Sequence, residues 1–329
     1  MKRATEDRLQ EIRRAAAQAF TSPNITNPGQ TQGHDSYYGL PALKPPVWTW
    51  EVPLYFFIGG ISGVSACIAF LAHVFRLDPA MIRVLLWVAL GGAGICPVLL
   101  IADLGRPLRF LNMLRVFKLR SPMSMGVWIL VAFSGCAFLA TVSNEADLRG
   151  YGSAIVLSIR WVGEASGAAT GLLLASYTGV LLGATAIPVW FRHRRLLPAH
   201  FLTSGLGGSS AILELSGFFI PATQILGFIT AGLEIAFEAL FEIRKPNVDA
   251  PLHHGRSGIA FRIAGLLEGL IALFIRICWG SLPGGRRAAA ICFLAGSLLS
   301  RYAWIWAGRV SAKQPDVQFA AQRSGGAKH

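Results

Sequence analysis

The sequence predicts an all-α integral membrane protein with about eight transmembrane helices and additional interfacial amphipathic helices. Of the 329 residues, 53% are hydrophobic and 14% are charged, whereas a soluble globular domain carries about 25% charged residues. The mean hydropathy is +0.51, and charge-poor runs of about 20 residues, the length needed to cross a bilayer, recur through most of the chain. The polar start of the chain has no apolar segment of the secretory-signal type.

Residues 1–36 are expected to form a polar arm. Apolar residues recur in it at helical spacing, so both a short amphipathic helix and a frayed terminus fit the pattern. A transmembrane domain is expected over residues 37–308, followed by a polar tail at 309–329. The predicted spans are 53–75, 82–103, 123–143, 164–191, 199–220, 222–243, 259–280 and 286–308.

The first span follows the stretch 37–63, YYGLPALKPPVWTWEVPLYFFIGGISG. Pro53 suits the first turn of a helix, where its missing N–H costs nothing. Gly59 and Gly63 form a small-residue face at which a second helix can approach closely. The fourth span is predicted to have a similar small-residue face, with a small residue at every fourth position from Gly167 to Gly183. Further along, the apolar run 199–243 is too long for one crossing, and its Gly217 and Pro221 predict a tight helical hairpin.

Two segments between the spans are predicted to be interfacial. In residues 104–122 the leucines share one helical face and five Lys or Arg residues supply the charge, which is typical of a helix lying on an anionic membrane surface. Residues 151–162 are too short to cross the membrane and contain Arg160. If 151–162 did cross, every later segment would change sides.

The distribution of positive charge predicts the orientation. Most of the 30 Lys and Arg residues fall in segments on the side of the N-terminus. The opposite side carries Arg76, Arg83, Arg149, Arg160, Arg286 and Arg287. Because cytoplasmic loops are enriched in Lys and Arg, both termini are expected in the cytoplasm. The net charge of +13 therefore reflects topology, and no nucleic-acid partner is expected.

Several cofactor classes lack the residues they need. The seven histidines lie at span ends or in loops, whereas a membrane cytochrome needs axial ligands facing each other inside the bundle. Five cysteines fall within predicted spans without a CxxC pair, so they are expected to be packing residues. No nucleotide-binding glycine motif follows a strand pattern. We therefore expect no haem and no iron–sulfur cluster in this chain.

The ionisable residues inside the predicted spans are the first candidates for function. They are Glu214, Glu234, Glu238, Glu268, Arg262, Arg276 and Arg301. Each costs about 2.5–3.5 kcal/mol to insert, so these groups are expected to pair with one another or to line water. Glu–Arg pairs that fix the bundle are one interpretation. A proton path through Glu214, Glu234, Glu238, Glu268, Arg276 and Arg301 is the other.

A second group of candidates lies where the first three spans meet at the N-terminal side of the membrane. Glu51, Tyr55, Asp103, Arg106 and Trp128 can converge there. A quinone head group needs a donor or acceptor at each carbonyl, an apolar or aromatic wall and a protonatable neighbour, and Glu51 with Tyr55 supplies this chemistry. Aromatic belts and Asp–Arg pairs at helix ends are also common in membrane proteins without such a site.

These residues lie in blocks that resemble the NrfD/PsrC-like family, the membrane subunits of polysulfide reductase and related complexes. The blocks are the stretch 37–63, DLGRPLRFLNMLRVFKLRSPMSMGVWIL, SYTGVLLGATAIPVW and RYAWIWAGRVSAKQP, and the resemblance covers about residues 37–315. It implies a haem-free protein of two four-helix bundles. It also implies a site for menaquinone or ubiquinone near the start of the first helix, formed here by Glu51, Tyr55, Asp103, Arg106, Ser121 and Trp128.

The resemblance further implies a function within a larger complex. Such subunits exchange electrons between the quinone pool and a docked ferredoxin-like iron–sulfur subunit, which leads to a molybdopterin-type or other catalytic subunit. Several relatives dock that partner outside the cytoplasmic membrane, whereas the charge distribution here places the corresponding face inside. A proton- or ion-translocating module and a passive membrane anchor are the alternative functions.

Overall fold

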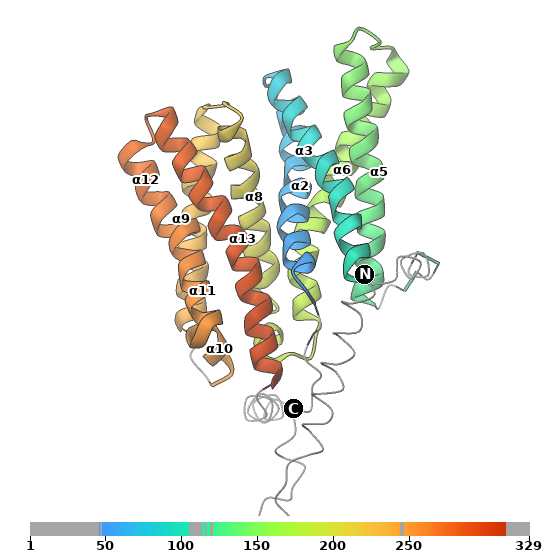
Figure 1. The fold of residues 1–329 in the computed structure, drawn as a ribbon. Coiled ribbons are helices and arrows are strands. Elements are labelled where there is room, and N and C mark those ends of the chain that lie inside the picture. The colour runs from blue at the N-terminus through green and yellow to red at the C-terminus, as the bar shows by residue number, and fades with distance from the viewer. Residues whose placement is uncertain are drawn as a thin grey trace, which may run out of the picture. The chain divides into compact units, whose positions relative to one another are not determined.

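The computed structural model describes residues 46, 48–104, 114–115, 117–118, 121–243 and 247–313. These residues form helices joined by short connections and contain no strand (Figure 1). The arm at 1–36, most of the interfacial segment predicted at 104–122, Arg106 and the tail beyond 313 lie outside the described residues. The expectation of an all-α membrane protein is confirmed.

Four helices form the N-terminal bundle. They are α2 (Glu51–Val74), α3 (Pro79–Asp103), α5 (Pro122–Leu148) and α6 (Ala154–Gly183). Side-chain caps fix where three of them begin: Asp78 accepts from Ala80 N at 2.9 Å before α3, and Ser121 and Ser153 accept from the first turns of α5 and α6. Such caps satisfy backbone N–H groups that have no partner within the helix. Helix α2 packs against both α3 and α6, and α5 packs against α6.

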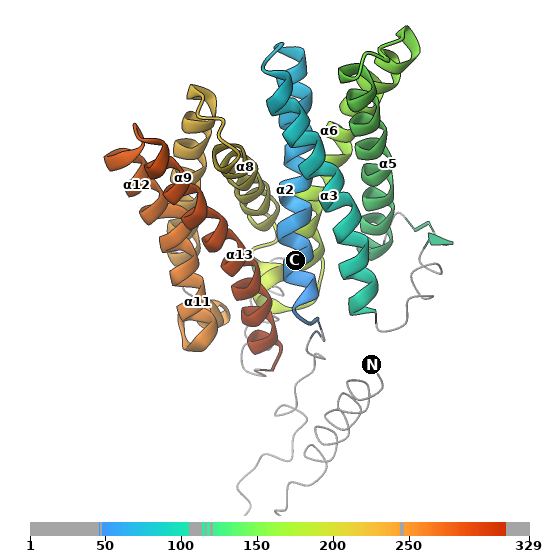
Figure 2. The same ribbon diagram turned by 45° about the horizontal axis from the view of Figure 1, so that its top comes forward.

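The C-terminal bundle contains four further long helical segments among the described residues. They are α8 (Leu197–Leu215), α9 (Pro221–Ile243), the continuous run of α11 (Gly255–Gly265), η3 (Leu266–Ile271) and α12 (Ala272–Trp279), and α13 (Pro283–Lys313). The short elements α7 (Pro188–Arg192), η2 (Asn247–Asp249) and α10 (Ala250–His253) connect them. Two views of the ribbon show the two groups of helices side by side, with α8 and α13 next to α2 (Figures 1 and 2).

Seven of the described helices are long and apolar enough to cross a membrane. Helix α8 is not among them, because its glycines and serines lower its mean hydropathy. Its 19 residues nevertheless span about 28 Å at 1.5 Å per residue, close to the hydrocarbon thickness of about 30 Å. The hairpin between α8 and α9 turns at Gly217, whose φ of +96° requires glycine, and α9 begins at Pro221 as predicted.

The structure corrects the prediction for residues 151–162. They are not a separate interfacial segment, because Ser153 caps α6 and the helix then runs without a break to Gly183. The charge of Arg160 was the reason for predicting an interfacial segment. In the structure this charge is buried and paired with Asp147 and Glu164. The number of crossings after α6 is therefore unchanged, and the start of α2 and the end of α13 lie at the same end of the molecule (Figure 1).

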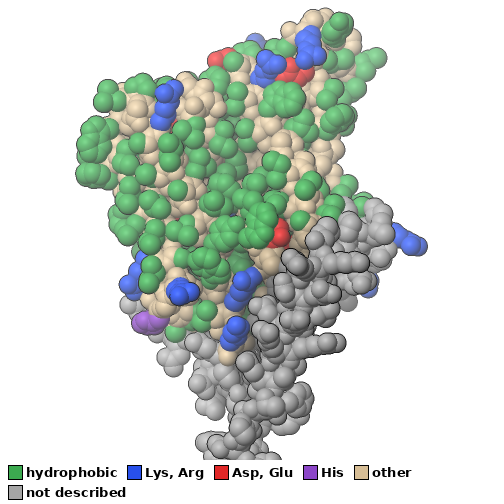
Figure 3. Space-filling model, in the orientation of Figure 1, with side chains coloured by type: hydrophobic (Ala, Val, Ile, Leu, Met, Phe, Trp, Pro, Cys, Tyr) green, Lys and Arg blue, Asp and Glu red, His purple; other side chains and the backbone are tan. Residues whose placement is uncertain are grey.

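Small residues allow the closest helix contact in the N-terminal bundle. A Cβ added at Gly63 would lie 2.2 Å from the carbonyl oxygen of Gly171, and one added at Gly171 would lie 2.3 Å from that of Gly63. The small-residue faces predicted on the first and fourth spans thus meet each other. On the outer surface, hydrophobic side chains cover the middle of the molecule, and Lys and Arg gather toward its two ends (Figure 3), as expected for a bilayer-spanning protein.

Candidate functional site

A pocket lies at the end of the N-terminal bundle where the chain enters α2. Its walls come from the starts of α2 and α5 and from the ends of α3 and α6. The lining side chains include Trp48, Val52, Tyr55, Asp103, Val127 and Tyr177, and the cavity volume is about 60 Å³. Most of this wall is apolar or aromatic, so the pocket suits a flat ring with few polar groups.

Two carboxylates are joined at this pocket through one threonine. Asp103, at the end of α3, accepts hydrogen bonds from the backbone N–H of Thr49 at 3.4 Å and from its hydroxyl at 3.1 Å. The same hydroxyl contacts the carboxylate of Glu51 at the start of α2. A hydroxyl donates one proton at a time, so Thr49 couples Glu51 to the pocket-lining Asp103.

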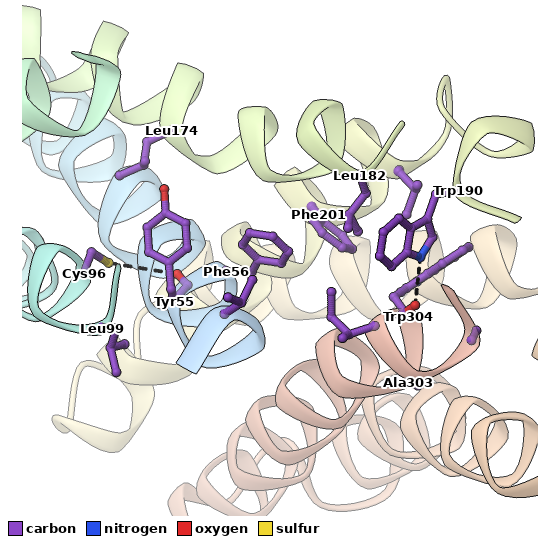
Figure 4. Packing of buried hydrophobic residues seen from close by; sticks show 14 of the residues in the cluster. Tyr55, Phe56, Cys96, Leu99, Leu174, Leu182, Trp190, Phe201, Ala303 and Trp304 are labelled. Carbon is purple, nitrogen blue, oxygen red and sulfur yellow. Dashed lines mark hydrogen bonds between the residues drawn. The ribbon is translucent and has the colours of Figure 1, made fainter. Parts of the chain in front are cut away.

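Two tyrosines form the aromatic wall. Tyr55 is 2% exposed, and its hydroxyl points toward Leu174 on α6 (Figure 4). The hydroxyl of Tyr177 donates to the carbonyl of Pro122, which holds the end of α6 against the start of α5. Its ring lies against Gly126, where an added Cβ would come within 2.2 Å of ring carbons. Gly126 thus leaves the room that Tyr177 needs to line the pocket.

Aromatic contacts connect this pocket to the C-terminal bundle. Trp48 stacks on Trp190 with ring centroids 5.4 Å apart and an interplanar angle of 13°. The indole N–H of Trp190 donates to the carbonyl of Trp304 on α13 at 2.8 Å (Figure 4). Near the same end, the hydroxyl of Tyr302 donates to the carbonyl of Trp50 at 3.0 Å. The two bundles are therefore held together beside the pocket.

The structure brings together part of the predicted quinone set. Tyr55 and Asp103 line the pocket, and Glu51 joins them through Thr49. Ser121 caps α5, and Trp128 packs edge-on against Phe117; neither lines the pocket. Arg106 lies outside the described residues. Sequence reasoning missed Trp48 and Tyr177 as lining residues, although both stand in the sequence blocks that carry the family resemblance.

Glu214, at the end of α8, forms a buried ion cluster with two arginines. Arg276 donates to both of its carboxylate oxygens, at 2.9 and 2.7 Å, and Arg286 donates to one of them at 2.9 Å. Arg286 also donates to the hydroxyl of Thr223 at 2.6 Å. Glu214 is fully buried, so these bonds supply the partners that a buried carboxylate requires. Of the two interpretations, the Glu–Arg scaffold describes Glu214 and Arg276.

A second buried cluster lies in the middle of the same bundle. His200 Nδ1 on α8 is 2.7 Å from Glu234 Oε2 on α9, and His200 Nε2 is 3.2 Å from the hydroxyl of Ser300 on α13. Glu268 on η3 and Arg301 on α13 complete the cluster, and these charged groups are at most 2% exposed. His200 lies only one turn into its helix, so its position in the sequence gave no sign of its burial. Sequence reasoning therefore missed it.

The middle cluster is incompletely paired within the described part of the chain. Glu234 Oε1, Glu268 Oε2 and two nitrogens of Arg301 are buried without a hydrogen-bond partner. Buried polar atoms of this kind are rare and call for an explanation such as function or bound water. Glu238 lies one turn from Glu234 and packs against Gly265. Arg262, expected to be buried, is exposed and reaches the carbonyl of His253.

A third buried network lies at the far end of the N-terminal bundle. Arg160 donates to Glu164 at 2.9 Å and to Asp147 at 2.7 Å, and His73 contacts the other oxygen of Glu164. The predictions placed these residues at span ends or in an interfacial segment. The missed signal was the i,i+4 spacing of Arg160 and Glu164, which places the two charges on one helix face.

The two bundles, the pocket between helix ends and the intramembrane ion clusters define a multi-pass membrane protein with polar sites inside its bundles. Residues 40–311 match the family model described as "Polysulphide reductase, NrfD". The chain therefore belongs to this family. It is 28% identical over 192 residues to "Protein NrfD" of Escherichia coli (strain K12). That match covers 50% of this chain and 58% of the relative, so the chain spans little more than half of that protein's length.

Proposed function

We propose that this chain is the quinone-reactive subunit of a respiratory complex and that menaquinone or ubiquinone binds in the pocket beside Tyr55. The pocket carries this proposal, because it combines an apolar and aromatic wall with a carboxylate, Asp103, that is coupled to Glu51. Those are the groups that a quinone head group requires. In the proposed arrangement the chain exchanges electrons with a docked ferredoxin-like iron–sulfur subunit, and through it with a molybdopterin-type or other catalytic subunit.

The residues of the chain have separate tasks in this proposal. A bound quinone supplies two-electron, two-proton redox chemistry. Tyr55 donates a hydrogen bond from the apolar wall, and Asp103 accepts one at the pocket. Thr49 passes a proton between Asp103 and Glu51, both of which are half-buried. Trp48 and Tyr177 exclude water from the ring.

The test compares two activities of the whole complex. Glu51→Gln should reduce quinone-linked turnover on the order of 100-fold, the usual size of a lost proton-transfer group, while turnover with an artificial acceptor stays normal. Tyr55→Phe should have a milder effect because it keeps the ring. Trp128→Phe is the matched control, since Trp128 does not line the pocket. Normal quinone turnover in both Glu51→Gln and Tyr55→Phe would overturn the proposal.

A second candidate function is coupled movement of protons or other ions through the C-terminal bundle. The unpartnered carboxylate oxygens of Glu234 and Glu268 favour it, because a structural ion pair would leave no such atoms. The expected signature is a complex with Glu234→Gln or Glu268→Gln that assembles and transfers electrons but builds no membrane potential. Normal coupling in both variants would exclude this candidate and leave the quinone proposal untouched.

A further inference from the structure

Three side chains in the middle of the C-terminal bundle offer ligand atoms around one point. His200, Glu234 and Glu268 come from α8, α9 and η3, and one ligand atom of each lies within 4.8 Å of the others. These separations are short enough for the atoms to share one small cation, whose bonds to oxygen are about 2–2.6 Å long. All three residues are at most 2% exposed, so bulk water does not solvate the cluster.

Two carboxylate oxygens of this trio have no hydrogen-bond donor in the described part of the protein: Glu234 Oε1 and Glu268 Oε2. His200 does not supply the missing partner. Its Nδ1 is occupied by Glu234 Oε2 and its Nε2 by the hydroxyl of Ser300. The two free oxygens are therefore open acceptors in a dry interior, where an unpartnered charge is costly.

The charges of the cluster add up to one negative charge. When both carboxylates are ionised and His200 is neutral, Glu234 and Glu268 contribute two negative charges and Arg301 one positive charge; Glu238, whose charge acts on both carboxylates, is a further acid outside this group. Arg301 donates to the carbonyl of Phe201 at 3.2 Å, and its guanidinium lies 3.7 Å above the Phe201 ring; neither contact alters the charge. One added positive charge therefore neutralises the cluster, whereas a divalent cation would leave it positive.

We propose that Glu234 and Glu268 bind one monovalent inorganic cation of the sodium type. The carboxylates provide two oxygen ligands, and the hydroxyl of Ser300 adjoins them through His200. Glu268 lies in the π-helical segment Leu266–Ile271. Such turns interrupt regular backbone pairing and are frequent at functional sites, and irregular backbone near the bilayer midplane coordinates Na⁺ in transporters. The proposal deepens the second candidate function by naming the ion.

The experiment uses the purified full chain in nanodiscs of neutral lipid. Equilibrium binding of ²²Na⁺ should saturate at one ion per chain. The melting temperature should rise with NaCl but not with choline chloride at the same ionic strength, because a ligand that binds only the folded state stabilises it. Glu234→Gln and Glu268→Gln should each weaken binding at least about tenfold, or about 1.4 kcal/mol. Glu242→Gln, on the same helix but paired with His253 at 3.4 Å and with 45% of its side chain exposed, should leave the affinity unchanged.

Three outcomes would overturn the cation site. The first is the absence of saturable ²²Na⁺ binding to the wild-type protein together with equal melting temperatures in both salts; a cluster that takes up only protons would then remain, and with it proton movement as the second candidate. Binding of Mn²⁺ or Zn²⁺ in place of Na⁺ would show that the site is selective for a divalent ion, which contradicts the proposed monovalent site. Undiminished ²²Na⁺ binding in both Gln variants would place the ion elsewhere. If either variant fails to fold, the ²²Na⁺ binding of the wild type and its melting temperatures in the two salts still decide.

Discussion

His200 on α8 and Glu234 on α9 are joined by a 2.7 Å hydrogen bond in a region where neither residue is more than 2% exposed. Both edges of the imidazole are occupied, since its other nitrogen meets Ser300. Phe241 and Trp304 pack against the same ring. Both nitrogens of the His200 imidazole are therefore used in hydrogen bonds, and neither is left open to coordinate a haem iron.

The purified chain should therefore carry no haem. His193, the other fully buried histidine near Trp304, bonds to Asp249 at 3.0 Å, and its ring contacts Phe241 and Trp304 as that of His200 does. Aromatic side chains occupy the space that a macrocycle would need. A reduced-minus-oxidised absorption spectrum should show no b-type bands, and iron analysis should find none bound to this chain. Stoichiometric b-type bands would contradict the assignment of both histidines to hydrogen-bond networks.

Replacing Glu214 should destabilise the protein more than replacing any other glutamate of the C-terminal bundle. Glu214→Gln leaves Arg276 and Arg286 buried without their anion, and breaking a buried pair in this way costs about 3–5 kcal/mol. The expected results are a lower melting temperature and poor assembly of the complex.

Glu238→Gln is the control for that comparison, because Glu238 is only half-buried and has no arginine partner among the described residues. Its melting temperature should stay close to that of the wild type. A Glu214→Gln variant that melts with the wild type would mean that the cluster of Glu214, Arg276 and Arg286 contributes nothing to the stability of the bundle.

Gly126→Ala should damage the pocket selectively. The added Cβ would lie 2.2 Å from ring carbons of Tyr177, so the ring must move into the pocket that it lines. Overpacking of this kind costs about 1–3 kcal/mol, and quinone affinity should fall with little effect on artificial-acceptor activity. Gly135→Ala, on the same helix with nothing within 4 Å of the added atom, should bind quinone normally. Equal quinone affinities in the two variants would show that the position of Tyr177 is irrelevant to binding.

Gly63→Ala should weaken the packing of α2 against α6. The new methyl group would lie 2.2 Å from the carbonyl of Gly171, and backbone cannot move aside as a flexible side chain can. A fall in melting temperature is expected, whereas Gly91→Ala on α3, which meets nothing within 4 Å, should melt like the wild type. Matching melting curves for both variants would argue against close α2–α6 contact in the bilayer.

Reporter fusions test the proposed orientation. The start of α2 and the end of α13 lie at one end of the molecule, and the connection after Leu148 lies at the other (Figure 1). Because positive charge concentrates on the side of the termini, a fusion after His329 should report the cytoplasm and one after Leu148 the opposite side. Identical reports from the two positions would mean that the chain crosses the membrane a different number of times between them.

Sequence alone determined the class of this protein and most of its helices. Long runs without charge identify lipid-spanning helices because the cost of inserting a charge is local to each residue. The hairpin at Gly217 was also predictable, because the left-handed backbone conformation there depends on a single residue. Family blocks around Glu51 and Tyr55 indicated where the pocket would be, although not that Trp48 and Tyr177 would line it.

Tertiary structure decided which charges became partners. Glu214 and Glu234 have the same chemistry and lie on consecutive helices, yet one is held by Arg276 and Arg286 and the other bonds to His200. The sequence separation of 62 residues between Glu214 and Arg276 shows why this pairing was not predictable. It depends on how far each helix is rotated about its axis and shifted along it, and those quantities are set by the packing of the whole bundle rather than by any local pattern.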